Sequence, residues 1–512
     1  MSFRRCAAVS LAVAGIGLSV AATGLASAAP RTMVRSALHP IAATSLAQPA
    51  LPIDHAGRWL TDAQGRVLLI HGINLSMKGS LSQSRAYRFG GDDAAFLAHN
   101  GFNAVRLTVE RYDIEPTPGH FDPAYLAFVR RMVRLLSSYG ILTLIDFHQD
   151  EFGPVFHDNG YPAWMTSTGG LPNVTSVGFP FQYLANPAVN HAFDNLWNNG
   201  KDSRGTPMWT DDAQILSTAV SALHSTPGVL GYEIINEPWP GSQYASCFVL
   251  LVGCPSFDQG KLSSYYAAMD KAIRAADPDH LVFFEPLVSF NYGIPSSVTP
   301  PPGDAKVAFA FHDYPLCSAA DDAGLPVSID TACGVESKLA ISNAVSYAAA
   351  HSTGLLETEF GATTKPAPIT QAATAYDAAM VPWMFWSYQE LVGSGSGGAF
   401  TTPPSKTPDR PVLASLARPY PQLIAGTPTG YGYDATSHVF TASYSTGRAK
   451  GSGRFGGDAV SQFAVPRIAY PHGYEVSTVG GAVVSGNDDP LLLIAANPGA
   501  KRVSVRVTPA TA

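Results

Sequence analysis

Charged residues are scarce in this sequence, and they do not gather into a basic run. Asp, Glu, Lys and Arg make up only 14% of the 512 residues, and the formal net charge is −7. A nucleic-acid-binding protein needs clustered positive charge to contact phosphates. The composition therefore argues against nucleic acid as a partner.

Motifs typical of several other protein classes are also missing. The first strand-to-helix turn lacks the G-x-G-x-x-G loop of a dinucleotide-binding sheet. There is no G-x-S-x-G turn, which disfavours a lipase or esterase. There is no C-x-x-C pair, and no histidines stand at the spacing of a zinc site. We therefore expect neither a metal nor a cofactor.

A long apolar stretch lies at the start of the chain, and no later stretch has about 20 uninterrupted apolar residues. Arg4 and Arg5 precede this stretch, and the small residues Ala26-Ser-Ala28 follow it. This order predicts a secretion signal over residues 1–29 and a secreted, extracellular protein. A membrane anchor is the alternative, but glycines and a serine interrupt the run. We expect residues 30–50 to be a disordered leader.

Cysteines are few, with five in the whole chain. Cys6 belongs to the predicted signal, so four remain in the exported protein. An even number in an exported protein suggests disulfides, and three pairings are possible. We favour the two local pairings, Cys247–Cys254 and Cys317–Cys333, each of which closes a loop.

Beyond residue 50 the sequence alternates between strand-like and helix-like segments. Eight apolar strands with helix-like segments between most of them predict a (β/α)8 barrel over residues 51–412. An open doubly wound sheet is the alternative. The predicted strands are 67–75, 104–109, 141–148, 229–236, 281–286, 307–314, 354–360 and 381–389.

The character of the chain changes after about Pro411. Short strands with turn residues and little helical periodicity predict a small all-β sandwich over residues 425–512. This domain could bind carbohydrate or pack against the barrel. We favour packing, because no aromatic platform stands out in the segment.

Two of the predicted strands end on carboxylates. Glu237 ends the stretch Leu230–Pro238 beside Asn236, whose amide can donate to a substrate hydroxyl. Glu359 ends the stretch Gly354–Gly361. Catalytic groups of barrel enzymes lie at this edge, and two carboxylates are the minimum equipment for cleaving a glycosidic bond.

Other side chains at the same edge can support this chemistry. Arg106 and Tyr314 can orient the nucleophilic carboxylate by hydrogen bonds. We expect the charge of the nucleophile to raise the pKa of the other carboxyl group, which must stay protonated. Trp386 offers an apolar face for a sugar ring. Asp146, His148, Asp150 and His312 also stand at strand ends.

Together these residues resemble glycoside hydrolase family 5, of the clan with the acid and the nucleophile on strands four and seven. Within that family, the chain is most similar to the endoglycoceramidases over about residues 50–410, and the resemblance extends to a terminal β-sandwich. The motifs that carry the resemblance are Met77-Lys-Gly79, Asp146-Phe-His-Gln-Asp-Glu-Phe152, Asn159-Gly-Tyr-Pro-Ala-Trp164, Phe193-Asp-Asn-Leu-Trp197 and Asn236-Glu-Pro-Trp239.

The resemblance implies that Glu237 is the acid/base and Glu359 the nucleophile of a retaining hydrolase. It implies that Lys78, Asp150 and Trp197 contact the sugar next to the cleaved bond. The substrate would be a glycosphingolipid, cut between oligosaccharide and ceramide, with transient contact to membranes or lipid micelles. We expect a monomer.

Several assignments remain open from the sequence. Glu357 rivals Glu359 as nucleophile, because alternation points both side chains the same way. We favour Glu359, because it lies nearer the end of the strand and directly before Phe360-Gly361. Glu233 and Asp146 fit buried structural acids, and His148 fits either a substrate contact or a packed core histidine. Trp164 and Trp239 could be loop anchors or ligand contacts. The aromatic residues of segment 152–184 could line a groove for a lipid tail or form the core of a long loop.

Two alternative functions remain at this point. Another family-5 β-glycosidase, such as a glucanase or a β-glucosidase, would use the same carboxylates on a substrate without lipid. A non-catalytic carbohydrate-binding protein is the alternative from another class, and the presence of both carboxylates argues against it.

Overall fold

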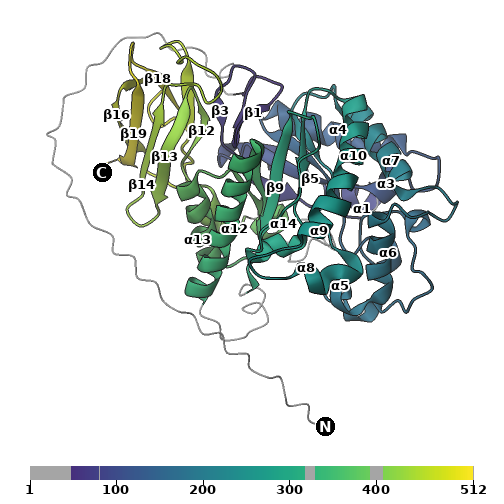
Figure 1. The fold of residues 1–512 in the computed structure, drawn as a ribbon. Helices are drawn as coiled ribbons and strands as arrows, with labels where there is room; N and C mark the ends of the chain where they lie inside the picture. The colour runs from purple at the N-terminus through teal and green to yellow at the C-terminus, as the bar shows by residue number, and fades with distance from the viewer. Residues whose placement is uncertain (1–47, 80, 317–328, 393–407, 511–512) are drawn as a thin grey trace. The chain divides into compact units, whose positions relative to one another are not determined.

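The computed structural model describes residues 48–79, 81–316, 329–392 and 408–510 (Figure 1). The predicted secretion signal lies outside these residues. None of the helices in the described ranges is both long and apolar enough to span a membrane.

Eight parallel strands close into a barrel, which confirms the predicted fold. Helices such as α4, α7 and α10 lie outside these strands (Figure 1). The barrel strands are, in order, β4 His71–Leu75, β5 Ala104–Glu110, β6 Leu142–His148, β7 Val229–Glu233, β8 Leu281–Phe284, β9 Val307–Asp313, β10 Gly354–Gly361 and β11 Trp383–Trp386.

Helices of ordinary length alternate with these strands, and shorter ones lie in the connecting loops. Helix α4 shows how the sequence starts one of them: the Asp122 carboxylate accepts hydrogen bonds from the Ala124 and Tyr125 amides, and Pro123 occupies the first turn. The helices are α1 Leu81–Ala86, α2 Gly91–His99, α3 Arg111–Ile114, α4 Pro123–Ser138, α5 Gln182–Ala185, α6 Pro187–Trp197, α7 Met208–Leu223, α8 Tyr244–Cys247, α9 Pro255–Phe257, α10 Ser263–Ala276, α12 Ile329–His351, α13 Pro366–Ala379, α14 Tyr388–Leu391 and α15 Arg410–Leu416.

The inside of the barrel changes from apolar to polar along each strand. On β6, Leu142 and Leu144 join a buried apolar cluster at the amino-terminal end, and Asp146 and His148 follow at the same alternation. On β9, Ala308 and Ala310 precede His312 in the same way. The apolar layers support the barrel, and the polar layers collect at the carboxyl-terminal edge.

Three short strands before the barrel join one of the two carboxyl-terminal sheets. The predicted strand 67–75 is in fact two strands, because β3 pairs with β12 while β4 belongs to the barrel. The seven-stranded sheet has the order β1 Asp54–Ala56, β2 Trp59–Thr61, β3 Val67–Leu68, β12 Tyr420–Ile424, β15 Val460–Ala464, β18 Leu491–Ala496 and β17 Gly481–Val483, and the four-stranded sheet has the order β13 Thr427–Asp434, β14 Val439–Ser445, β19 Arg502–Pro509 and β16 Tyr474–Val479.

These two antiparallel sheets enclose an apolar core of their own, as a β-sandwich does. Leu60 and Leu68, from the strands before the barrel, instead join the apolar cluster inside the barrel. The amino-terminal strands therefore bury side chains against the barrel interior while their backbone extends the carboxyl-terminal sheet.

A buried polar cluster links the barrel to the carboxyl-terminal segment. The His71 ring stacks on Tyr420 with centroids 3.6 Å apart, and its Nε2 lies 3.1 Å from Asp377. Arg418 pairs with the same carboxylate at 2.9 Å, and the Tyr431 hydroxyl donates to it at 3.2 Å. Asp377 thus pairs with Arg418 and also contacts His71, Trp383 and Tyr431, which come from different parts of the chain.

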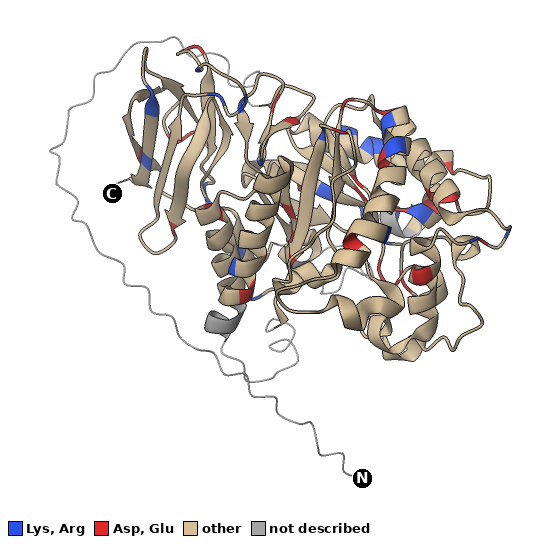
Figure 2. Cartoon of the chain, in the orientation of Figure 1, with Lys and Arg blue, Asp and Glu red and all other residues tan. Residues whose placement is uncertain are grey.

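Long loops follow β6 and β7 at the carboxyl-terminal edge of the barrel. The loop after β7 carries no charged residue from 238 to 257, and the loop after β6 carries none from 159 to 190. Figure 2 shows the resulting long stretches of uncharged ribbon.

Replacing Arg418 with alanine is expected to destabilise the protein, because the Asp377 carboxylate would remain buried without its cation. Removal of one partner of a buried ion pair costs about 3–5 kcal/mol. Urea denaturation followed by circular dichroism measures the change. The control is Lys450→Ala, which removes an exposed ion pair with Asp54 at 3.8 Å. Equal stability of the two variants would contradict the assigned role of Asp377.

Candidate active site

Glu237 stands just beyond the end of β7, on a strained turn. Its φ is +41°, in the left-handed region that side chains other than glycine rarely adopt. Its amide donates to Glu285 Oε2 at 3.0 Å, and Pro238 follows it. The bond to Glu285 holds the turn in this conformation.

The Glu237 carboxyl group has the hydrogen bonding of a general acid. Its Oε1 accepts from Asn291 Nδ2 at 2.7 Å and lies 3.0 Å from His312 Nδ1. Burial, and next the charge of Asp150, raise the pKa of Glu237 to about 7. Because Oε1 is occupied, the acidic proton is left for Oε2.

The pKa and the contacts of His312 indicate which ring nitrogen carries the hydrogen. Burial lowers the pKa of His312 to about 3, so the imidazole is neutral at neutral pH. We assign the hydrogen to Nδ1, which then donates to Glu237 Oε1, and this leaves Nε2 as an acceptor. Nε2 lies 3.5 Å from Glu285 Oε1.

Glu359 lies on β10, next to the same histidine. Its Oε2 accepts a hydrogen bond from the Tyr314 hydroxyl at 3.0 Å and lies 3.7 Å from His312 Nδ1. Its Oε1 accepts from Arg106. One imidazole nitrogen therefore lies within 4 Å of both predicted catalytic carboxylates.

Arg106 lies at the centre of the acidic groups and is fully buried. Burial would lower the pKa of its guanidinium, but the surrounding carboxylates raise it well above its usual value. The guanidinium contacts Asp146 at 3.1 Å, Asn236 at 2.9 Å, Asn74 at 3.2 Å, Glu285 at 3.5 Å, and both Glu233 and Glu359.

Asp146 and Glu233 are buried structural acids, as the sequence suggested. Each binds Arg106, and burial raises the pKa of Glu233 to about 7 despite that contact. Asn236 Nδ2 donates to the Gln149 carbonyl at 3.0 Å. The side-chain amide of Asn236 therefore bonds to other residues of the site. Its predicted hydrogen bond to a substrate hydroxyl stays a prediction.

A second network holds Lys78 and Asp150 in place. His148 contacts Asp146 at 2.6 Å and Asp150 at 3.2 Å, so both ring nitrogens are engaged. Burial would lower the pKa of His148, but the two carboxylates raise it to about 10. Lys78 binds Asp150 and lies 4.6 Å above the Trp386 ring. His148 therefore supports Asp150 and has no ring nitrogen left for a sugar.

Glu359 and its rival Glu357 have different surroundings in the structure. The pairing of β10 with β9 shifts register between these two residues. Glu357 is fully buried, and its Oε2 accepts from the Met384 amide at 3.2 Å. The bulge thus breaks the simple alternation that made the two acids equivalent in the sequence.

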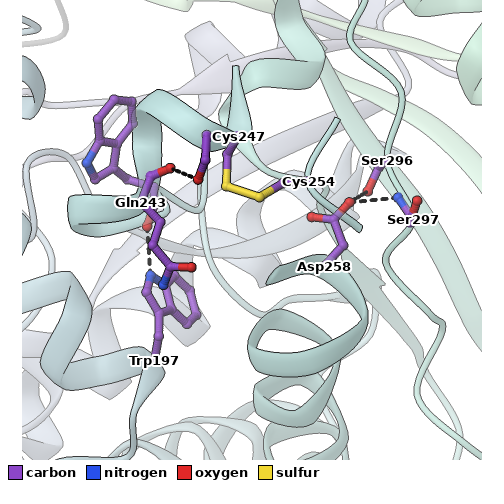
Figure 3. Close-up of a disulfide and its surroundings, with 9 residues drawn as sticks. Trp197, Gln243, Cys247, Cys254, Asp258, Ser296 and Ser297 are labelled. Carbon is purple, nitrogen blue, oxygen red and sulfur yellow. Dashed lines mark hydrogen bonds between the residues drawn. A yellow bond between two sulfur atoms is a disulfide. The ribbon is translucent and has the colours of Figure 1, made fainter. Parts of the chain in front are cut away.

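The loop tryptophans act as anchors. Trp164 donates to the Glu115 carbonyl at 3.1 Å, and Trp239 donates to Asn190 at 2.8 Å. Trp197 is only 2% exposed and donates to the Trp239 carbonyl at 2.7 Å (Figure 3). The prediction of a sugar contact for Trp197 therefore has no support in this arrangement, because the ring is packed inside the loop.

Segment 152–184 divides between the two alternatives left open by its sequence. Its first part forms a private core: Phe152, Phe156 and Tyr161 are fully buried. Phe179 and Phe181 instead lie exposed at the surface.

One of the two predicted disulfides is present. Cys247 and Cys254 are bonded and close a short loop (Figure 3). Cys317 lies outside the described residues, so its pairing with Cys333 stays a prediction.

Sequence reasoning missed Glu285 and Asn291. Glu285 continues the inward alternation of Leu281 and Phe283 along β8, which is a signal that could have found it. Asn291 lies in the 3-10 helix Val288–Tyr292 beyond that strand, where no periodic pattern marks it.

Two groups among the described residues have the composition of a metal site: Asp146 with His148 and Glu359, and Glu233 with Glu285 and His312. The Arg106 guanidinium contacts four of these carboxylates. A bound cation would compete with Arg106 for the same oxygens, so the donor sets do not fit a metal ion well.

Comparisons with known proteins show to which family the chain belongs. Residues 70–391 match the model described as "Cellulase (glycosyl hydrolase family 5)", and residues 418–508 match "Glycoside hydrolase family 5 C-terminal domain". The chain belongs to glycoside hydrolase family 5. It is therefore a glycosidase with the barrel and terminal domain of that family.

Individual relatives agree with this placement. The chain is 31% identical over 473 residues to Endoglycoceramidase I of Rhodococcus hoagii, covering 90% of this chain and 89% of that one. It is 26% identical to Endoglycoceramidase of Hydra vulgaris, covering 81% and 80%. The solved structure titled "Endo-glycoceramidase II from Rhodococcus sp.: Ganglioside GM3 Complex" matches with a TM-score of 0.73 at 25% identity, covering 88% and 99%.

Replacing Glu285 tests its role in this family-5 site. Burial raises the pKa of Glu285 well above its usual value, which favours its protonated form. Gln can accept from the Glu237 amide and donate to His312, so Glu285→Gln should keep kcat within about tenfold of the wild type. Glu285→Ala frees the Glu237 turn and should lower kcat by about 100-fold. Steady-state kinetics on an aryl β-glycoside measure both, and a Gln variant as inactive as Ala would contradict a neutral Glu285.

Proposed function

We propose that this protein is a secreted retaining endo-β-glycosidase that hydrolyses the bond between oligosaccharide and ceramide in glycosphingolipids. The catalytic part of the proposal rests on Glu237 and Glu359, which converge on one nitrogen of His312. The glycolipid part rests on similarity along both domains to proteins named endoglycoceramidase.

In the first step, Glu359 attacks the anomeric carbon and forms a glycosyl ester. At the same time Glu237 gives its proton to the oxygen that leaves with the ceramide. In the second step Glu237, now a carboxylate, takes a proton from water. The water oxygen attacks the same carbon and releases Glu359, so the configuration is retained.

The surroundings of each carboxyl group suit its part. Glu359 is oriented by the Arg106 guanidinium and the Tyr314 hydroxyl. Glu237 has a pKa raised by burial, so it holds a proton near neutral pH. Retaining enzymes hold their two carboxyl groups only about 5 Å apart. Both carboxyl groups lie within 4 Å of His312 Nδ1, which supports such a short separation between them.

Lys78 and Asp150 are the proposed contacts to the sugar next to the cleaved bond. Asp150 is held by Lys78, by His148 and by Asn159 Nδ2 at 3.0 Å. Trp386, which packs against both Lys78 and His148, bounds the same region. This support fixes the positions of charged groups that can select among hydroxyls.

Secretion is part of the proposal and rests on the signal-like order of residues 1–29. Sequencing the amino terminus of the protein recovered from the culture medium of an expressing bacterium tests it. We expect the exported chain to begin just after Ala28 or Ala29. Retention of the intact chain inside the cell would contradict export.

Incubation with a panel of glycosphingolipids, followed by mass spectrometry, tests the substrate. We expect intact oligosaccharide and free ceramide as products. Glu359→Gln should lower the rate by at least about 1,000-fold, because the attacking carboxylate is lost. Release of single sugars only, or cleavage of β-glucans without cleavage of glycolipid, would contradict the glycolipid assignment and leave another family-5 β-glycosidase.

The pH dependence of kcat/KM tests Glu237 as the acid. Activity should fall as the pH rises above about 7, because the carboxyl group loses its proton. The hydrogen bond from Asn291 stabilises the carboxylate and lowers this pKa. Asn291→Ala should therefore shift the alkaline limb to higher pH.

Asn343→Ala is the matched control for this shift, because its amide donates to the Gly293 carbonyl at 2.9 Å and to neither catalytic carboxylate. The control should keep the wild-type pH profile. An alkaline limb that does not move in Asn291→Ala would show that another group is the acid.

A further inference from the structure

The disulfide loop carries an unusually exposed apolar tip. Between Cys247 and Cys254, Val249, Leu250, Leu251 and Val252 are all exposed, and Leu251 is 76% accessible to solvent. The surrounding segment 244–257 contains no charged residue. An exposed cluster of large apolar side chains on a protein surface usually marks a binding surface.

A disulfide and hydrogen bonds hold the base of this loop. The two cysteines are buried and bonded to each other. Asp258, just beyond the loop, accepts hydrogen bonds from Ser296 Oγ at 3.1 Å and the Ser297 amide at 2.7 Å (Figure 3). A Cβ at Gly253 would collide with the Pro295 carbonyl. These contacts hold the loop in a conformation that leaves its apolar tip exposed to solvent.

A second apolar segment is exposed on the loop after β6. Phe179, Phe181 and Leu184 are each more than half exposed. They lie within segment 159–190, which contains no charged residue. These side chains, together with the tip of the disulfide loop, are called the apolar rim below.

A chain of ring contacts joins the two parts of the apolar rim beside the active site. Phe179 contacts Tyr183 with centroids 6.4 Å apart, Tyr183 contacts Trp239 at 4.9 Å, and Trp239 contacts Phe248 at 5.6 Å. Trp239 follows the acid Glu237 by two residues. The rim therefore borders the catalytic site.

We propose that the apolar rim is the surface by which the enzyme docks on a lipid bilayer or micelle, inserting its side chains between the lipids. This inference rests on the proposed function, in which the substrate is anchored in such a surface by its ceramide. The rim borders the carboxyl groups that must reach the bond just above the lipid. Its lack of charge suits uncharged or zwitterionic lipid rather than a charged partner.

The composition of the rim also predicts how the binding of vesicles depends on salt and on lipid charge. Apolar insertion does not depend on counterions, whereas attraction between opposite charges is screened by salt. With a chain charge of −7 and no basic residue in the rim, anionic lipid brings no gain. Binding to phosphatidylcholine vesicles should persist in high salt and should not increase when phosphatidylserine is added.

Two variants test the rim directly. In Leu250→Ser/Leu251→Asn, the asparagine suits the left-handed backbone at position 251, where φ is +69°. In Phe181→Ser, the serine stands at the start of α5, where serine is favourable. The control is Val479→Ser, which removes an equally exposed side chain (74%) on strand β16.

Flotation with phosphatidylcholine vesicles free of glycolipid measures docking. Losing one inserted leucine or phenylalanine weakens partitioning by about tenfold. We expect at least that loss in each rim variant and none in the control. Equal loss in the control, or unchanged binding in the rim variants, would overturn the proposal. So would a wild-type protein that pairs with a second copy through the rim and does not bind vesicles.

Activity assays on a soluble and on a membrane-embedded substrate distinguish a failure of docking through the rim from a failure of the proposed function. The rim variants should cleave a water-soluble aryl β-glycoside at the wild-type rate, which also shows that they fold. They should lose about tenfold in cleavage of glycosphingolipid embedded in vesicles. If the wild type binds vesicles through the rim but cleaves no glycosphingolipid, the substrate assignment fails and the docking surface stands. If it cleaves embedded glycolipid and the rim variants do so equally well, docking through the rim fails and the substrate assignment stands.

Discussion

One buried guanidinium organises the active site. Arg106, on β5, contacts Asp146 on β6, Glu233 on β7 and Glu359 on β10, so it ties together strands from around the barrel. A buried cation is tolerated only when carboxylates and other acceptors satisfy it, and buried carboxylates equally need a cation. The positions of these acids are therefore interdependent. Removal of Arg106 would leave several carboxylates buried without a partner.

The same charge distribution suits the two carboxyl groups to the different roles proposed for them. Glu359 receives the guanidinium and a tyrosine hydroxyl, which suit a carboxylate that must attack. Glu237 receives an amide and a neutral imidazole, and burial raises its pKa. The sequence-based expectation was that the charge of the nucleophile raises this pKa. In the structure, burial comes first and the charge of Asp150 second. In the proposed mechanism, two identical side chains take opposite roles because only one of them touches a cation.

The sequence predicted the barrel well, because eight apolar runs separated by helical periodicity leave few other folds. It also placed the candidate catalytic residues at one edge, since parallel strands share their carboxyl ends. It did not show Glu285 as part of the site, although alternation with Phe283 marked it. Alternation alone did not separate Glu357 from Glu359, because a bulge is a local irregularity of pairing, and only the position at the strand end favoured Glu359. The joining of β1–β3 to the terminal sheet depends on pairing between distant segments, which no local pattern reveals.

We infer that Glu359 is the nucleophile, held by Arg106 opposite the acid Glu237. The most direct measurement uses a 2-deoxy-2-fluoro β-glycoside with a good leaving group, which slows the second step so that the glycosyl ester accumulates. Peptide mapping by mass spectrometry then locates the sugar. We expect one label per molecule, on Glu359. A label on Glu357 or Glu237, or turnover of normal substrate without any covalent label, would contradict it.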